Sequence, residues 1–210
     1  IQDYQVIRGL EVVNKFKSEL EYLDFARHME PIERIQRQSD DGRQFFIVQT
    51  RGGGELLTRA LIIATGVRQK RLEVPGEKEF IMRGLCYSAL SYAPLFIEKE
   101  TVVVGDGDLA LRSAAELATV AKHVSLIRPV GEAVDAPLYK KLKAAQNVTV
   151  LDKTQVVAVK GDEYAKSVVV KTPQGAEREI VADGTFIEMG LVPNTQMVAG
   201  LVDLDEQGRI

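Results

Sequence analysis

A strand, a glycine turn and a helix in the middle of the chain constrain its fold more than any other feature. Residues 102–110 read VVVGDGDLA, which is a G-x-G-x-x-A pattern directly after a β-branched run. An alanine- and leucine-rich helix is predicted over 109–121 and a second strand over 124–127. Strand, turn, helix and strand in this order predict a parallel βαβ unit of the kind that binds dinucleotides.

The turn itself predicts a pyrophosphate site. Gly105 permits the tight turn, Gly107 leaves room for a phosphate near the backbone, and Ala110 lets the helix approach the sheet. The helix N-terminus adds free N–H groups and a partial positive charge. The predicted nucleotide-binding residues here are Gly105, Asp106, Gly107, Asp108, Leu109 and Ala110. Two alternatives stay open: a glycine turn kept only for packing, and Asp108 as a helix cap.

The end of the second strand bears on which nucleotide binds. NAD sites usually carry Asp or Glu there, about 20 residues after the glycines, to bind the ribose hydroxyls. This chain has Arg128 instead, which favours the 2′-phosphate of NADP over NAD. An exposed arginine at a strand end, with no ligand, is an equal alternative.

The rest of the pattern predicts an α/β protein that repeats itself. An amphipathic helix is expected over 9–23 and a helix that begins with proline over 137–146. The apolar run 60–64 predicts a strand buried on both faces. Further strands are predicted at 32–36, 45–50, 148–151, 155–159, 167–171, 179–181 and 185–189.

Two blocks of sequence match each other at a nearly constant offset. FIVQT at 46–50 corresponds to VVVKT at 168–172, and ALIIATG at 60–66 corresponds to GTFIEMG at 184–190. The same offset would place the glycine turn of the first copy before Ile1. The sequence therefore predicts that the chain lacks the opening βαβ unit of its first domain.

Composition excludes several classes of partner. A formal net charge of −3 gives no reason to expect nucleic acid or an anionic membrane. No apolar run approaches the ~18 residues of a membrane span. One cysteine, Cys86, cannot form an internal disulfide and fits a reducing cytoplasm. With only two histidines besides, no metal site is expected.

At this point the sequence resembles the thioredoxin-reductase-like pyridine nucleotide–disulfide oxidoreductases over nearly its whole length. The similar segments are LIIATG at 61–66, LEVPGE at 72–77, GLCYSA at 84–89, FIEMGLVPNT at 186–195 and VDLDEQG at 202–208. The resemblance implies a Rossmann-like FAD/NAD(P)-binding fold, in which each of two related domains has a parallel sheet with helices and an antiparallel β-meander. It also implies a homodimer.

The resemblance further implies which part of the chain serves which cofactor. Residues 1–80 would be a partial FAD-binding domain, 81–192 the NAD(P)-binding domain, and 193–210 the start of the return into the FAD domain. The strand exits would add Thr65, Gly66, Met189 and Gly190 to the cofactor-binding residues.

The chain departs from the family where the chemistry is done. Cys86 is the catalytic candidate, but the family's second cysteine is replaced by Ala89, and dithiol–disulfide exchange needs a resolving thiol. Cys86 is thus either a small core residue or a lone reactive thiol. Other family positions also differ: the arginines that grip the NADP 2′-phosphate fall at Pro129, Val130 and Val134, and an acidic pair early in the nucleotide helix is Arg112-Ser113.

These observations predict part of an FAD-dependent NAD(P)H oxidoreductase that is not itself a thioredoxin reductase. NAD(P)H would be the donor, and a small molecule or another protein the electron acceptor. The 210 residues alone would be inactive, because both FAD segments of the family lie outside them. The competing interpretation is a degenerate, non-catalytic module that binds a nucleotide or a regulatory partner.

Overall fold

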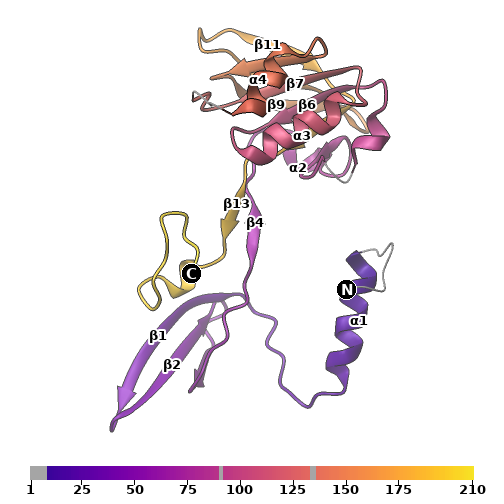
Figure 1. Cartoon of the computed structure of the whole chain (residues 1–210). Coiled ribbons are helices and arrows are strands. Elements are labelled where there is room, and N and C mark those ends of the chain that lie inside the picture. The colour runs from indigo at the N-terminus through magenta and orange to yellow at the C-terminus, as the bar shows by residue number, and fades with distance from the viewer. Residues whose placement is uncertain (1–8, 90–91, 133–135) are drawn as a thin grey trace. The chain divides into compact units, whose positions relative to one another are not determined.

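The computed structural model describes residues 9–89, 92–132 and 136–210 (Figure 1). The chain divides into two compact units. Unit 1 comprises Ile1–Ile63 and Met197–Leu201, and unit 2 comprises Ala64–Gln196 and Val202–Ile210. The predicted fold class is confirmed, because parallel and antiparallel sheets occur together with helices.

Unit 1 holds a helix and an antiparallel sheet. Helix α1 (Gly9–Glu21) forms where the apolar spacing predicts it, but it buries none of its residues. The sheet has the order β1-β2-β3, with β1 (Ile32–Asp40), β2 (Arg43–Thr50) and β3 (Glu55–Thr58). The strand predicted at 32–36 is therefore longer than expected, because Asp41 and Gly42 make a tight turn with positive φ that lets β1 pair along β2.

The buried strand predicted at residues 60–64 is not formed, and this prediction is wrong. The segment has no regular structure, and the Ile62 side chain is 96% exposed. A central strand needs neighbours on both edges to satisfy its backbone N–H and C=O groups. None of the described strands pairs with this segment, so its apolar character alone does not make it a strand.

Unit 2 is built on a five-stranded parallel sheet. Its order is β5-β12-β6-β7-β8, and every neighbouring pair is parallel. The strands are β5 (Leu85–Cys86), β6 (Glu100–Val104), β7 (His123–Arg128), β8 (Val148–Asp152) and β12 (Gly184–Ile187). Sequence order reverses between β6 and β12, and such a switch point is where open α/β sheets bind their ligands.

The apolar strands of this sheet are buried on both faces. Val103 faces helices α3 (Asp108–Ala118) and α4 (Pro137–Ala144) in one core cluster. Val102 and Val104 face the antiparallel sheet β9 (Gln155–Gly161), β10 (Ala165–Lys171) and β11 (Glu177–Val181) in another. Two covered faces explain why residues 101–104 of β6 are an unbroken run of β-branched residues instead of an alternating pattern.

The chain enters and leaves the part of unit 2 that holds the parallel sheet through two paired strands. β4 (Val67–Gln69) runs antiparallel to β13 (Leu191–Pro193), with Val67 opposite Pro193. The remaining short elements are helix α2 (Glu77–Phe80) and the 3₁₀ turns η1 (Ala93–Phe96) and η2 (Gln196–Val198). Among the described residues, no helix combines the length and apolar character that crossing a membrane requires.

Candidate nucleotide-binding site

Packing within the protein explains the first glycine of the turn. Gly105 follows β6, and its N–H donates to the Ile127 carbonyl at 2.9 Å. An added Cβ would lie 2.2 Å from the Glu188 carbonyl oxygen and 2.9 Å from the Ala110 Cβ. Ala110 is fully buried. Gly105 and Ala110 are therefore needed for the helix and the two strands to meet, with or without a ligand.

The protein's own packing does not explain the second glycine. Gly107 has φ −83° and ψ 178°, which any residue can adopt. An added Cβ would meet no atom within 4 Å in the described part of the chain. Gly107 precedes helix α3 as its N-cap and supplies no side-chain cap, so the space beside it and the first amides of α3 are available to an anion.

The other residues of the turn are placed as follows. Asp108 is not the helix cap that the sequence suggests; it is the first residue of α3 and forms an exposed ion pair with Arg112 at 2.8 Å. Leu109 is 41% exposed beside it. The Asp106 carboxylate accepts hydrogen bonds from the N–H groups of Val130 (3.1 Å) and Gly131 (2.8 Å). Asp106 thereby fastens the turn after β7 to the glycine turn.

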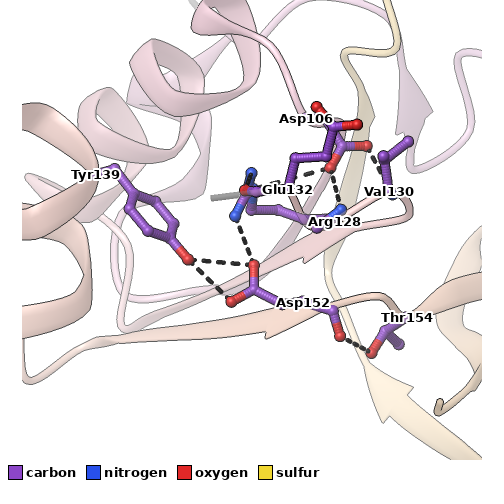
Figure 2. Close-up of polar contacts among 8 residues, drawn as sticks. Asp106, Arg128, Val130, Glu132, Tyr139, Asp152 and Thr154 are labelled. Atoms are coloured by element: carbon purple, nitrogen blue, oxygen red, sulfur yellow. Dashed lines mark hydrogen bonds and ion pairs between the residues drawn. The ribbon is translucent and has the colours of Figure 1, made fainter. Parts of the chain in front are cut away.

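Arg128 points into the protein and is 1% exposed. Its Nη1 donates to Asp152 Oδ1 at 2.6 Å and its Nη2 to the Glu132 carbonyl at 2.7 Å. The guanidinium carbon lies 4.6 Å from the ring centre of Tyr139, whose hydroxyl donates to Asp152 (Figure 2). The alternative of an exposed arginine is wrong, because Asp152 and Tyr139 supply the partners that a buried guanidinium needs.

Sequence reasoning missed a buried carboxylate beside the glycine turn. Glu188 follows β12 and is 4% exposed. Its Oε1 accepts hydrogen bonds from the Ser113 hydroxyl at 2.8 Å and from the Ala89 N–H at 3.1 Å. Ser113, where the family carries an acid, is thus the donor that a carboxylate at 188 requires. A polar residue at the end of an apolar strand, as in FIEMG, was the available indication.

Cys86 lies in strand β5, half-buried, opposite Phe186 of β12. It packs against the core cluster that contains Ala89, which is completely buried. Burial raises the pKa of the Cys86 thiol, so the thiolate that exchange chemistry needs is disfavoured. These features agree with the core-residue interpretation of Cys86.

The residues predicted at the two strand exits make the following contacts within the protein. The Thr65 hydroxyl donates to the Asn194 carbonyl at 2.6 Å, and the Asn194 N–H donates to the Gly66 carbonyl at 3.0 Å. Met189 packs against the core cluster between the parallel sheet and strands β9 and β10. Gly190 has φ +94°, and its carbonyl accepts the Lys70 N–H at 3.0 Å.

The two family arginine positions that the structure describes lie in the turn after β7, where Pro129 is partly buried and Val130 is 58% exposed. Val134 lies outside the described residues. Within the ranges described, no three His, Cys, Asp or Glu side chains gather as they would around a metal ion.

A glycine turn between a buried parallel strand and a helix, at a switch point of the sheet, defines a Rossmann-type dinucleotide-binding unit. Residues 5–210 match the family model described as pyridine nucleotide-disulphide oxidoreductase. The chain therefore belongs to this family, and its resemblance to the thioredoxin-reductase-like members is confirmed.

Two curated relatives cover most of the chain. It is 32% identical to a protein named NADH dehydrogenase from Bacillus subtilis over 170 residues, which are 80% of this chain and 33% of that protein. It is 33% identical to the alkyl hydroperoxide reductase F protein of Pseudomonas aeruginosa over 196 residues, 89% of this chain and 38% of that protein. The chain thus spans roughly a third of the length of these relatives.

Solved structures show the same fold. The thioredoxin reductase of Streptococcus pyogenes MGAS5005 has a TM-score of 0.76 at 26% identity, covering 99% of this chain and 67% of that one. The thioredoxin reductase of Giardia duodenalis has a TM-score of 0.77 at 25% identity, covering 99% and 68%.

Proposed function

We propose that the glycine turn of unit 2 binds a nicotinamide dinucleotide, NAD or NADP, as the electron-donor site of an FAD-dependent oxidoreductase. The observation that carries the proposal is the contrast between the two glycines. Gly105 is required by contacts within the protein, whereas no atom of the described residues fills the space beside Gly107. A glycine that packing does not require is expected where a ligand approaches the backbone.

The residues of the turn have distinct tasks in this proposal. The first amides of α3 donate to the pyrophosphate, and Gly107 lets it approach them. Ala110 and Gly105 hold the helix against β6, which fixes the direction of those amides. Asp106 holds the turn after β7, where the adenosine ribose binds in Rossmann units. When bound, the nicotinamide supplies a hydride.

FAD belongs to the proposal through the family, and the described residues do not build a pocket for it. Thr65 and Gly66 are the positions that the resemblance assigns to FAD, and both are hydrogen-bonded to Asn194. The segment before them forms no strand. No step of electron transfer to flavin is therefore derived from this chain.

The proposed electron acceptor is a small molecule or another protein, not an internal disulfide, so the enzyme is not a thioredoxin reductase. Position 89, which would carry the second cysteine, is a fully buried alanine whose N–H is bound by Glu188. In the full-length flavoprotein, Cys86→Ser should accordingly leave NAD(P)H oxidation within a few-fold of wild type. Loss of turnover in this variant would make Cys86 a redox residue. A homodimer in the cytoplasm completes the proposal.

The donor site can be tested by nucleotide binding to wild type, Gly107→Val and Gly9→Val, measured by calorimetry. Gly9 is a matched control, because an added Cβ there also meets no atom of residues 9–89, 92–132 and 136–210 within 4 Å, while it lies in unit 1. We expect Gly107→Val to weaken NADH or NADPH binding at least tenfold and Gly9→Val to leave it unchanged, with both variants folded. Wild type that binds neither nucleotide would overturn the proposal and favour the non-catalytic module.

A further inference from the structure

The arginine at the end of β7 is buried inside the protein. Both terminal nitrogens of Arg128 are occupied, by the Asp152 carboxylate and by the Glu132 carbonyl. Its remaining donor, Nε, is buried without a hydrogen-bond partner among the described residues and lies 3.9 Å from Asp106 Oδ1. Its flat face lies against Tyr139. A bidentate grip on a phosphate needs two N–H groups of the fork that the ligand can reach, and a side chain that is 1% exposed presents no such pair to a ligand.

We propose that this site selects NADH and discriminates against NADPH; the inference rests on the proposed function of the glycine turn. A 2′-phosphate brings about −1.5 to −2 charges at neutral pH and must be matched by free basic groups. Here the cation at the strand end is already neutralised by Asp152 from β8 (Figure 2). The charged group left to meet a ligand beside the turn after β7 is the Asp106 carboxylate.

Asp106 is suited to a ribose hydroxyl and unsuited to a phosphate. An ionised carboxylate has about four acceptor positions, and the N–H groups of Val130 and Gly131 use two of them. Its side chain is 28% exposed, so it retains acceptor capacity toward solvent and ligand. In NAD sites the acid that accepts hydrogen bonds from the ribose usually ends the second strand. Here Asp106 belongs to the glycine turn, but its carboxylate reaches the turn after that strand, where its charge would repel a 2′-phosphate.

Arg112 and Lys153 also lie near the end of β7, but neither supplies a free, fixed positive charge for a 2′-phosphate. Arg112 on α3 is paired with Asp108 at 2.8 Å. Lys153 follows Asp152 and is exposed, and its Cγ would lie 2.9 Å from a Cβ added to Gly131. An exposed ammonium on a long side chain is solvated and contributes little. Val130, exposed in the turn itself, adds an apolar surface where a basic side chain would meet a 2′-phosphate.

The experiment compares NADH and NADPH binding to wild type, Val130→Arg and Val181→Arg by nicotinamide fluorescence. Val181 is a matched control, since it is 69% exposed like Val130 at 58% but lies just before β12 begins, at the amino ends of the parallel strands. We expect wild type to bind NADH at least tenfold more tightly than NADPH. Val130→Arg should narrow this ratio several-fold by gaining NADPH affinity, and Val181→Arg should leave it unchanged.

The possible results separate the inference from the proposal beneath it. Equal or tighter binding of NADPH by wild type would overturn the selectivity and leave the nucleotide site intact. If wild type prefers NADH but Val130→Arg does not narrow the ratio of the two affinities, the selectivity does not come from the turn after β7, and the inference is overturned. Binding of neither nucleotide would overturn the proposed function, and the inference with it.

Discussion

The buried contact between Glu188 and Ser113 allows a quantitative test of what holds the glycine turn in place. We consider Ser113→Ala, Glu188→Met and the double variant. Ser113 is completely buried and Glu188 is 4% exposed, so water cannot replace a lost partner without a change in packing. The contact joins α3 to the end of β12, on either side of Gly105.

The expected magnitude follows from the two hydrogen bonds that the carboxylate accepts. A hydrogen bond to a charged group contributes about 1.5–3 kcal/mol, and a buried donor left without a partner costs about 1–3 kcal/mol. Ser113→Ala should therefore lower the free energy of unfolding by about 1.5–3 kcal/mol. Glu188→Met leaves two buried donors without an acceptor, the Ser113 hydroxyl and the Ala89 N–H. It should lower the free energy of unfolding by about 2–6 kcal/mol.

The measurement is urea unfolding of wild type, both single variants and the double variant. The coupling energy of the cycle should be about 1.5–3 kcal/mol, in line with one charged hydrogen bond. Ser167→Ala is the matched control: its hydroxyl also donates to a glutamate, Glu179, but that carboxylate is exposed. We expect the control to lower the urea midpoint by less than Ser113→Ala does, because solvent can replace a lost partner of an exposed carboxylate. A Glu188–Ser113 coupling below about 0.5 kcal/mol, the usual error of additivity, would refute the reasoning.

The same unit supports three further predictions. Gly105→Ala should lower the free energy of unfolding by about 1–3 kcal/mol, because its Cβ meets backbone; an unchanged urea midpoint would contradict this. Burial raises the pKa of the Cys86 thiol, so a thiol probe at neutral pH should react more slowly than with free cysteine, and faster reaction would refute it. Burial, then the hydrogen bond to Glu77, raise the pKa of Tyr87 from 10.0 to about 12. Its contribution to stability is then present below pH 10 and lost toward pH 12. Ultraviolet titration should show a late tyrosinate, which should form at lower pH in Glu77→Phe because that variant removes the hydrogen bond and leaves the burial.

Local patterns predicted most of unit 2 because its strands and helices satisfy their own requirements. The run at 102–104 is apolar on both faces, and the structure covers both faces. The strand at 124–127 and the helix at 137–146 form within one or two residues of the predicted bounds. In these segments the local preference and the surrounding packing favour the same structure.

The errors lie where a residue depends on partners from distant elements. The run 60–64 has the composition of a central strand, but composition does not supply the neighbouring strands that it needs. Arg128 looks exposed in sequence because its partners, Tyr139 and Asp152, come from later elements. Glu188 was missed because its donors lie 75 and 99 positions earlier in the chain.

The pairing of β4 with β13 has a consequence for how such a unit can be moved between proteins. Since Val67 lies opposite Pro193, the segment between them begins and ends at a single place. A host chain could accept the whole segment at one surface turn, as it would accept a two-stranded hairpin, without spanning any new distance. The same closeness of its ends makes the segment a suitable scaffold for circular permutation, with new termini placed in the exposed turn between β10 and β11.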